Sequence, residues 1–135
     1  MPITPMNVTW RAPPPRWRRN PPVGFLRPCE LTLVDRPPAG PGWLHEVKHD
    51  GFRVLVRKLG ERSTVRSRRG ADFTYRFPAI AEAVRGLNVD RAPIDGEAVV
   101  LRDDGGSDFG ALMTKRGGEQ AVLVAFDLLR LVGVD

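Results

Sequence analysis

The stretch WLHEVKHDGFRVLVRKL, residues 43–59, carries the clearest structural pattern in this chain of 135 residues. Asp50-Gly51 is a turn signal between two segments that are rich in apolar residues. The pattern predicts a short strand at residues 43–47 and a longer one at residues 52–59. Lys48 then stands at the end of the first strand, and Arg53 stands on the returning strand.

Further elements are predicted on the C-terminal side of this stretch. Three more strands are predicted, at residues 63–68, 94–101 and 121–131. The last of them begins with an apolar run at residues 121–126, which is typical of a strand in the centre of a sheet. Two helices are predicted, one at residues 78–87 and one from a Ser107 cap through Thr114. Strands with interspersed helices predict the α+β fold class.

Residues 1–28 differ in composition from the rest of the chain. They hold eight of the 13 prolines, and they are predicted to form a disordered Pro/Arg-rich arm ahead of a domain at residues 29–135. Residues 1–29 contain five arginines and no acidic residue, and these arginines account for the net charge of +5 of the chain. Guanidinium groups in such an arm can hold a phosphate backbone.

The sequence indicates a protein of a reducing compartment. Cys29 is the only cysteine, so no internal disulfide can form. No apolar run reaches the length of a membrane span, and no secretory signal is recognised. A cytoplasmic location without membrane association is therefore predicted.

Lys48 is a candidate nucleophile. Only Lys48, Lys58 and Lys115 are lysines among 21 basic residues, which suggests that a lysine is retained where its amine must lose a proton. An ordinary lysine has a pKa of about 10.4 and is almost entirely charged at neutral pH. Desolvation, a metal ion or a nearby cation such as Arg53 lowers the pKa of a lysine, and arginines also stabilise the charge that develops in phosphoryl transfer.

Four stretches resemble motifs of the covalent nucleotidyltransferase superfamily, which contains ATP-dependent DNA ligases, RNA ligases and capping enzymes. Lys48-His49-Asp50-Gly51-Phe52-Arg53 resembles its Lys-x-Asp-Gly-x-Arg motif. Three stretches follow in the family's order: Ser67-Arg68-Arg69-Gly70, where Arg69 replaces the usual Asn, Asp95-Gly96-Glu97, and Ala125-Phe126-Asp127-Leu128-Leu129. Over about residues 25–135 the chain resembles bacterial ATP-dependent ligases of the end-joining type.

The resemblance implies the front part of a nucleotidyltransferase domain. This is the ATP-grasp-like adenylation domain of ligases, with a mainly antiparallel sheet and two or more helices. Two later motifs of the family and its OB-fold domain are not recognised in the sequence. The resemblance thus predicts a fragment of the domain, and two alternatives stay open: a naturally short product, or a split protein in which a separate chain supplies the missing C-terminal motifs.

The resemblance also implies a reaction and its participants. Lys48 is the residue that becomes adenylylated from ATP, and the AMP then passes to a 5′-phosphate of nicked or broken duplex DNA in repair or recombination. Glu97 helps to place a divalent cation, Mg²⁺ or Mn²⁺, because a carboxylate suits such a hard ion.

The same resemblance implies a set of nucleotide contacts. Glu46 recognises the edge of the adenine, and Phe126 stacks on its ring. Arg53 and Arg68 contact the ribose or the phosphates, and Glu97 holds the ribose. An aromatic face suits a base, and a guanidinium suits a phosphate.

Other functions remain open at the level of the sequence. One is a non-catalytic nucleic-acid-binding remnant that uses the arm and a cluster of arginines, namely Arg53, Arg57, Arg66, Arg68 and Arg69. Another is an RNA ligase or a capping-type transferase, which shares the first motif.

A zinc-protease pattern, His-Glu-x-x-His, also occurs at residues 45–49. Its chemistry requires both histidines on one face of a helix. Gly42 and Asp50-Gly51 leave too few residues between them for a stable helix, which argues against this function.

Overall fold

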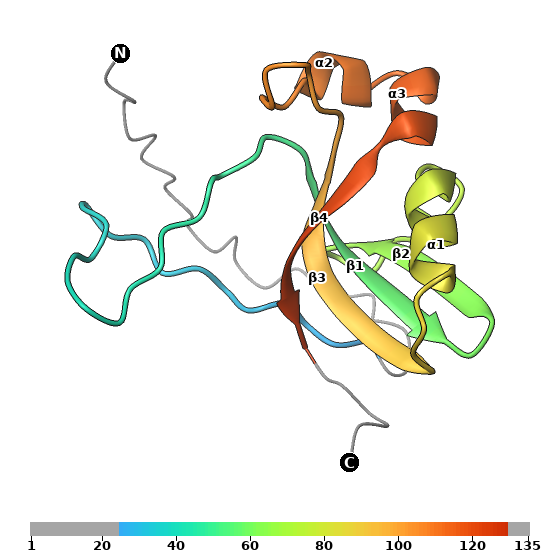
Figure 1. The fold of residues 1–135 in the computed structure, drawn as a ribbon, viewed down its shortest axis with the longest axis horizontal. Coiled ribbons are helices and arrows are strands. Elements are labelled where there is room, and N and C mark those ends of the chain that lie inside the picture. The colour runs from blue at the N-terminus through green and yellow to red at the C-terminus, as the bar shows by residue number, and fades with distance from the viewer. Residues whose placement is uncertain (1–24, 130–135) are drawn as a thin grey trace. The chain divides into compact units, whose positions relative to one another are not determined.

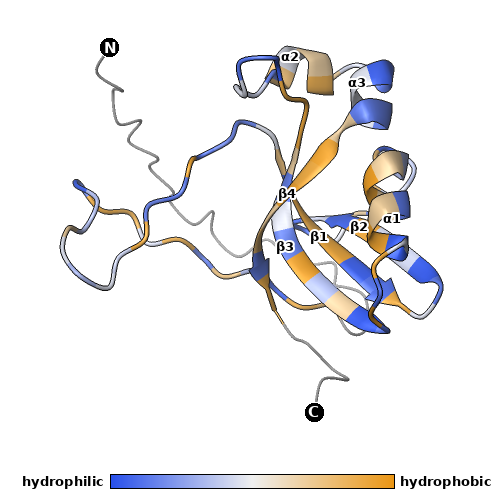
Figure 2. Cartoon of the chain, viewed as in Figure 1, coloured by the Kyte–Doolittle hydropathy of each residue, from blue (hydrophilic) through white to orange (hydrophobic). Residues whose placement is uncertain are grey.

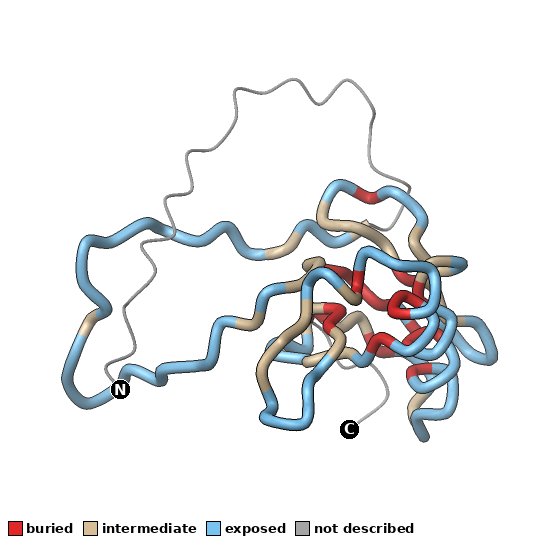
Figure 3. Tube along the Cα trace, turned by 90° about the horizontal axis from the view of Figure 1, so that it is seen from above, coloured by how far each residue is buried: buried red, intermediate tan, exposed pale blue. Residues whose placement is uncertain are grey.

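The computed structural model describes residues 25–129 (Figure 1). In this range the elements are, in chain order, β1 (Phe52–Leu59), β2 (Arg62–Ser67), α1 (Pro78–Arg85), β3 (Arg91–Val99), α2 (Phe109–Leu112), α3 (Lys115–Gln120) and β4 (Val122–Leu128). The described residues belong to two units, residues 29–47 and residues 25–28 with 48–129. Residues 29–47 form no helix or strand and are nearly all exposed (Figure 3).

The strands form one antiparallel sheet with the order β2-β1-β3-β4. β1 and β2 make a hairpin in which Leu59 pairs with Arg62 across Gly60 and Glu61. Gly60 has φ of 56°, a conformation that suits a residue without Cβ in so tight a turn. An antiparallel sheet with accompanying helices confirms the predicted α+β class.

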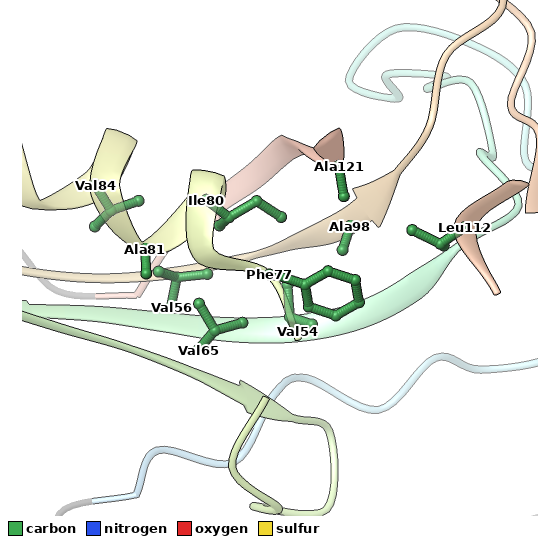
Figure 4. Close-up of a cluster of buried hydrophobic side chains, with 10 residues drawn as sticks. All are labelled: Val54, Val56, Val65, Phe77, Ile80, Ala81, Val84, Ala98, Leu112 and Ala121. Carbon is green, nitrogen blue, oxygen red and sulfur yellow. The ribbon is translucent and has the colours of Figure 1, made fainter. Parts of the chain in front are cut away.

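One face of the sheet carries the hydrophobic core. Side chains alternate along a strand, and Val54 and Val56 of β1 are buried on the face covered by α1. Ile80 and Val84 of α1 pack against them, as Figure 4 shows. Figure 2 shows the matching alternation of hydrophobic and hydrophilic residues along the strands. On the α1 face, the buried Lys58 donates a hydrogen bond from Nζ to the carbonyl of Arg85.

Two strand predictions are wrong in part. Residues 43–47 form no strand: their apolar side chains Trp43, Leu44 and Val47 are exposed, and a strand persists only where its backbone pairs with a neighbour. The apolar segment predicted at residues 121–131 forms β4, but β4 lies at the edge of the described sheet. It pairs with β3 alone, so most of its side chains remain accessible.

The helix at residues 78–87 is confirmed, although it ends at Arg85. The second predicted helix is present as α2, but its cap is Asp108, whose side chain accepts a hydrogen bond from the Ala111 amide at 2.8 Å. α3 is not predicted from the sequence, because Gly117 and Gly118 have low helix propensity. Its cap is Thr114, and Gly117 lies so close to the backbone of α2 at Ala111 that no side chain would fit.

No helix in the described range has the length and apolar composition that crossing a membrane requires.

Phe77 is the largest fully buried side chain of this core, and its truncation tests the core. Phe77→Ala is expected to lower the free energy of unfolding by about 3–5 kcal/mol, because lost burial and a cavity both contribute. The measurement is chemical denaturation followed by circular dichroism. Tyr75→Ala is the matched control, since Tyr75 is 96% exposed; equal losses in the two variants would contradict the described packing.

Candidate active site

Residues 48–51 approach the end of β3 closely. The amide of Gly51 donates a hydrogen bond to Oε1 of Glu97 at 3.0 Å, and the amide of Asp50 donates to the hydroxyl of Ser107 at 2.8 Å. A Cβ on Gly51 would collide with the Ala98 carbonyl and would lie 2.7 Å from a methyl of Val99. Gly51 is therefore required by close packing, and its φ is not in the left-handed region that a glycine turn would use.

The sheet face opposite the core gathers most of the predicted site residues. β1 and β3 pair so that Arg53 faces Glu97, while Phe52 and Val54 on either side of Arg53 belong to the other face. Val54 pairs with Ser67, the last residue of β2, and Arg53 and Arg68 are the residues that adjoin this last pair along the two chains. Arg53 and Glu97 thus lie together on this face, and Arg68 follows the neighbouring strand at the same end.

Asp95 and Phe126 both contact the guanidinium of Arg53. Its Nε and one terminal nitrogen donate to the two carboxylate oxygens of Asp95 at 3.1 and 2.7 Å. Its guanidinium carbon lies 5.5 Å from the centroid of the Phe126 ring, a cation–π distance. The Asp95 side chain is 1% exposed and that of Arg53 is 19% exposed, so little water competes for this ion pair.

Phe126 reaches this position because the β3–β4 pairing is irregular. Asp95 pairs with Asp127 and Gly96 with Ala125, which leaves Phe126 as an extra residue in β4. A Cβ on Gly96 would lie 2.6 Å from the Val124 carbonyl, so this glycine allows the close approach of the strands. Phe126 remains 40% exposed, so part of the residue is accessible from solvent.

Asp95 was not expected as a site residue. It belongs to the Asp-Gly-Glu motif, but the contact appears only in the structure: the register pairs Arg53 with Glu97, and Asp95, two residues earlier on the same face of β3, forms the ion pair with Arg53 diagonally. The sequence alone does not indicate which carboxylate of the motif faces which arginine.

Glu97 has an altered acidity. Burial raises the pKa of its carboxyl above the ordinary value, and the hydrogen bond from the Gly51 amide opposes this shift. The positive charges of Lys48 and His49 also act to lower the pKa of Glu97, which indicates that both lie near its carboxylate. Lys48 itself is exposed, so its amine is accessible from solvent.

The Ser67–Gly70 stretch is a structured turn after β2. Gly70 has φ of 87° and donates to the Ser67 carbonyl at 2.8 Å. The Ser67 hydroxyl accepts from the amides of Arg69 and Ala71 at 3.3 and 3.0 Å. These bonds fix the backbone at the half-buried Arg68, while Arg69 is exposed.

Two further sequence predictions concern residues 45–49: the adenine contact of Glu46 and the zinc-protease pattern. Glu46 belongs to the separate unit of residues 29–47 and is exposed. His45, Glu46 and His49 lie in a segment that forms no helix, as expected. Within residues 25–129 no three or more His, Cys, Asp or Glu side chains are grouped so that they alone could hold a metal ion.

Comparison with known proteins gives consistent matches. Residues 36–135 match the family described as ATP dependent DNA ligase domain. The chain is 36% identical over 121 residues to the multifunctional non-homologous end joining protein LigD of Pseudomonas aeruginosa, covering 87% of this chain and 13% of that protein. The family resemblance that the motifs predict is thereby confirmed.

Two solved structures match as well. One is the ligase domain of LigD from M. tuberculosis, with a TM-score of 0.55 and 35% identity. The other is a mycobacterial DNA ligase D complexed with ATP and MES, with a TM-score of 0.56 and 35% identity. Each match covers 66% of this chain and 30% of the solved chain, so this chain spans only a minor part of each relative.

The raised pKa of Glu97 predicts a pH-dependent contribution to stability. Because the folded-state pKa lies above the ordinary value of 4.5, the stabilisation is complete below that pH and is lost as the pH rises through the folded-state pKa. Glu97→Gln keeps an oxygen for the Gly51 amide and carries no charge. The variant is expected to be more stable than the wild type at pH 7.

The measurement is guanidinium denaturation of the wild type and Glu97→Gln over a series of pH values. The difference in free energy of unfolding is expected to decrease as the pH falls from 7 through the folded-state pKa, and to be constant below about 4.5, the ordinary value for a glutamate. A difference that is the same at every pH would show that burial does not act on the charge of Glu97.

Proposed function

The chain belongs to the ATP-dependent DNA ligase family, and we propose that it forms the part of a ligase nucleotidyltransferase domain that carries the adenylylated lysine. The observation that supports this proposal is the row formed by Arg53, Glu97 and the exposed ring of Phe126, beside the accessible amine of Lys48. The activity is ATP-dependent joining of DNA ends, of which this chain performs the first step.

In the first step Lys48 reacts with ATP. The lone pair of Nζ forms a bond to the α-phosphorus, and the bond from that phosphorus to the bridging oxygen of pyrophosphate breaks. The amine loses a proton to solvent or to a neighbouring base, and pyrophosphate leaves with the electron pair. The product is a lysyl-AMP phosphoramidate, a covalent adduct that stores the energy of the broken anhydride.

The residues present fit an adenine nucleotide. The accessible ring of Phe126 offers a stacking surface for the base. Arg53 holds a guanidinium at the same place, and because Asp95 orients it, little side-chain freedom is lost when ribose or phosphate oxygens bind. Arg68, which follows the last residue of β2, contributes a second guanidinium. The family resemblance alone assigns Glu46 to the edge of the adenine.

Glu97 is the carboxylate that suits a divalent cation in this row. Mg²⁺ in nucleotide enzymes commonly binds through one or two carboxylates, the substrate phosphates and water, so a full set of protein ligands is not needed. A cation bound there, Mg²⁺ or Mn²⁺, would neutralise charge on the phosphates. Glu97 keeps its hydrogen bond to the Gly51 amide, which fixes the carboxylate beside Lys48.

The later steps use DNA and the rest of a ligase. The adenylyl group passes from Lys48 to a 5′-phosphate at a nick or break, and a 3′-hydroxyl then displaces AMP. A separate chain that carries the later motifs of the family is a candidate partner for these steps. An RNA ligase or capping-type transferase would differ in the nucleic acid that accepts AMP and in nucleotide choice.

Labelling with ATP tests the first step. The purified chain, incubated with Mg²⁺ and α-labelled ATP, is expected to retain label after denaturation and to gain the mass of one AMP. Lys48→Ala is expected to abolish the label, since the nucleophile is lost. Lys115→Ala is the matched control, because Lys115 is also an exposed lysine.

A label that persists in Lys48→Ala would refute the assignment of the nucleophile. If the wild type takes up no label, the assay is repeated with a second chain that supplies the later family motifs. Absence of label in both formats would favour the non-catalytic nucleic-acid-binding function.

Truncation of Phe126 tests the stacking surface. Phe126→Ala is expected to weaken the binding of ATP by about 5- to 150-fold, because stacking of a base on an aromatic ring contributes about 1–3 kcal/mol. The measurement is the ATP concentration that gives half-maximal labelling. Leu128→Ala, an exposed apolar residue on the same strand, is the control and is expected to leave that concentration unchanged.

Phe126→Tyr, which keeps an aromatic face, is expected to restore ATP binding. An equal effect of Phe126→Ala and Leu128→Ala would instead indicate a general disturbance of β4.

A further inference from the structure

Arg76 is a cation with no anionic partner in the described structure. Its guanidinium lies over the rings of Phe52, Phe77 and Phe73, at 5.0, 5.6 and 6.0 Å from their centroids. Its Nε is buried and has no hydrogen-bond partner. Among residues 25–129 the only hydrogen bond recorded for its side chain runs from a terminal nitrogen to the sulfur of Met113 at 3.9 Å, and no ion pair includes it.

This arrangement leaves the hydrogen-bonding capacity of the guanidinium largely unused. Cation–π contact with aromatic rings contributes about 0.5–2 kcal/mol, but it satisfies none of the five N–H donors. A thioether sulfur is a weak acceptor. A half-buried guanidinium in a fixed orientation is well suited to a phosphate, whose oxygens accept two parallel hydrogen bonds.

The rings that hold Arg76 are themselves immobilised. Phe52 contacts Phe73, Phe77 and Phe109 at centroid distances of 6.1, 6.2 and 5.5 Å. Gly118 of α3 packs against the backbone of Arg76: a Cβ there would lie 2.8 Å from the Arg76 carbonyl. α3 therefore lies directly beside Arg76.

Two further cations stand on α3. Lys115 and Arg116 are exposed, and the Lys115 ammonium is 4.0 Å from Glu119, a long and solvent-exposed pair of little strength. Phe109 and Met113 of the α2 segment are exposed large apolar residues. The α2–α3 surface is defined here by these groups: Arg76, Phe109, Met113, Lys115 and Arg116.

The α2–α3 surface lies at the end of the sheet where the nucleophile segment enters β1. Phe52, which contacts both Arg76 and Phe109, is the first residue of β1 and follows directly on residues 48–51. The Asp50 amide is bonded to Ser107, which leads into α2. Figure 1 shows α2 and α3 together at this end of the sheet.

We propose that the α2–α3 surface binds the phosphate backbone of duplex DNA beside the nick, with Arg76 as a pre-oriented phosphate ligand and Lys115 and Arg116 as further contacts. The identity of the ligand as DNA rests on the proposed function. The choice of a polyanion rests on charge complementarity and on the unpartnered guanidinium. Phosphate contacts at this end position a 5′-phosphate toward Lys48 without reading base sequence.

The test is binding of a fluorescent nicked duplex to the full 135-residue chain, followed by anisotropy over a range of salt concentrations. The variants are Arg76→Gln and the double variant Lys115→Gln/Arg116→Gln. Arg91→Gln is the matched control: Arg91 is an exposed arginine that pairs with Leu59, at the opposite end of β1 from Phe52.

Each lost phosphate contact is expected to lower the slope of log affinity against log salt by about 0.9 and to weaken binding by roughly 5- to 10-fold near 0.1 M salt. Arg76→Gln is therefore expected to lose the slope and the affinity of about one phosphate contact, and the double variant those of about two. Arg91→Gln is expected to bind as the wild type does. Circular dichroism identifies any loss of folding in Arg76→Gln, and the double variant changes only exposed side chains.

Two results would overturn the proposal. One is a double variant that binds nicked duplex with the affinity and salt slope of the wild type. The other is an Arg91→Gln control that loses as much affinity for the nicked duplex as the variants do, which would indicate general attraction by net charge. Labelling of Lys48 by ATP is measured in parallel and is expected to be unchanged in all variants, so failure of the first catalytic step is distinguished from failure of this surface.

Discussion

The register of β1 against β3 is the constraint on which the rest of this structure depends. Arg53 faces Glu97, and Val54 faces Gly96. At adjacent positions β1 therefore places an arginine on the sheet face opposite the core, called the open face below, and a valine in the core. A slip of one residue would exchange the two faces along the whole strand. Gly51 allows the close approach to β3, because a side chain there would collide with the Ala98 carbonyl, and Gly96 allows the close approach of β3 and β4.

The ion pair between Arg53 and Asp95 illustrates how the open face is stabilised. Removing an aspartate from water is costly, and a buried pair often contributes little net stability relative to apolar residues of the same size. Its value here is geometric, since two hydrogen bonds to Asp95 and the ring of Phe126 hold the guanidinium at one place. If one partner were removed, the other would remain as an uncompensated charge in a site with little water.

The two faces of the sheet thus divide stability from chemistry. The α1 face has valines, alanines and Phe77 in close contact, while the opposite face presents charged groups whose acidity responds to burial, as for Glu97. The end of the sheet at residues 48–52 is where the two meet. There Gly51 contacts Glu97, and the neighbouring Phe52 belongs to the aromatic cluster beneath Arg76.

Much of this organisation is predictable from the sequence, because it is local. The alternation in residues 52–59, the helical spacing after Pro78 and the motif residues Lys48, Arg53 and Glu97 all follow from patterns within a few positions. Family membership also follows from motif order. α3 is not predicted, since its formation depends on the Thr114 cap and on packing rather than on the helix propensity of its residues.

The sequence by itself determined the α+β class, most elements and the family. The tertiary structure decided which side chains meet. The pairing of Asp95 with Arg53, the bulge that brings Phe126 to the open face, the edge position of β4 and the absence of a strand at residues 43–47 depend on strand order and register. These are contacts between residues distant in the chain, and hydrophobic pattern does not specify which strand lies beside which.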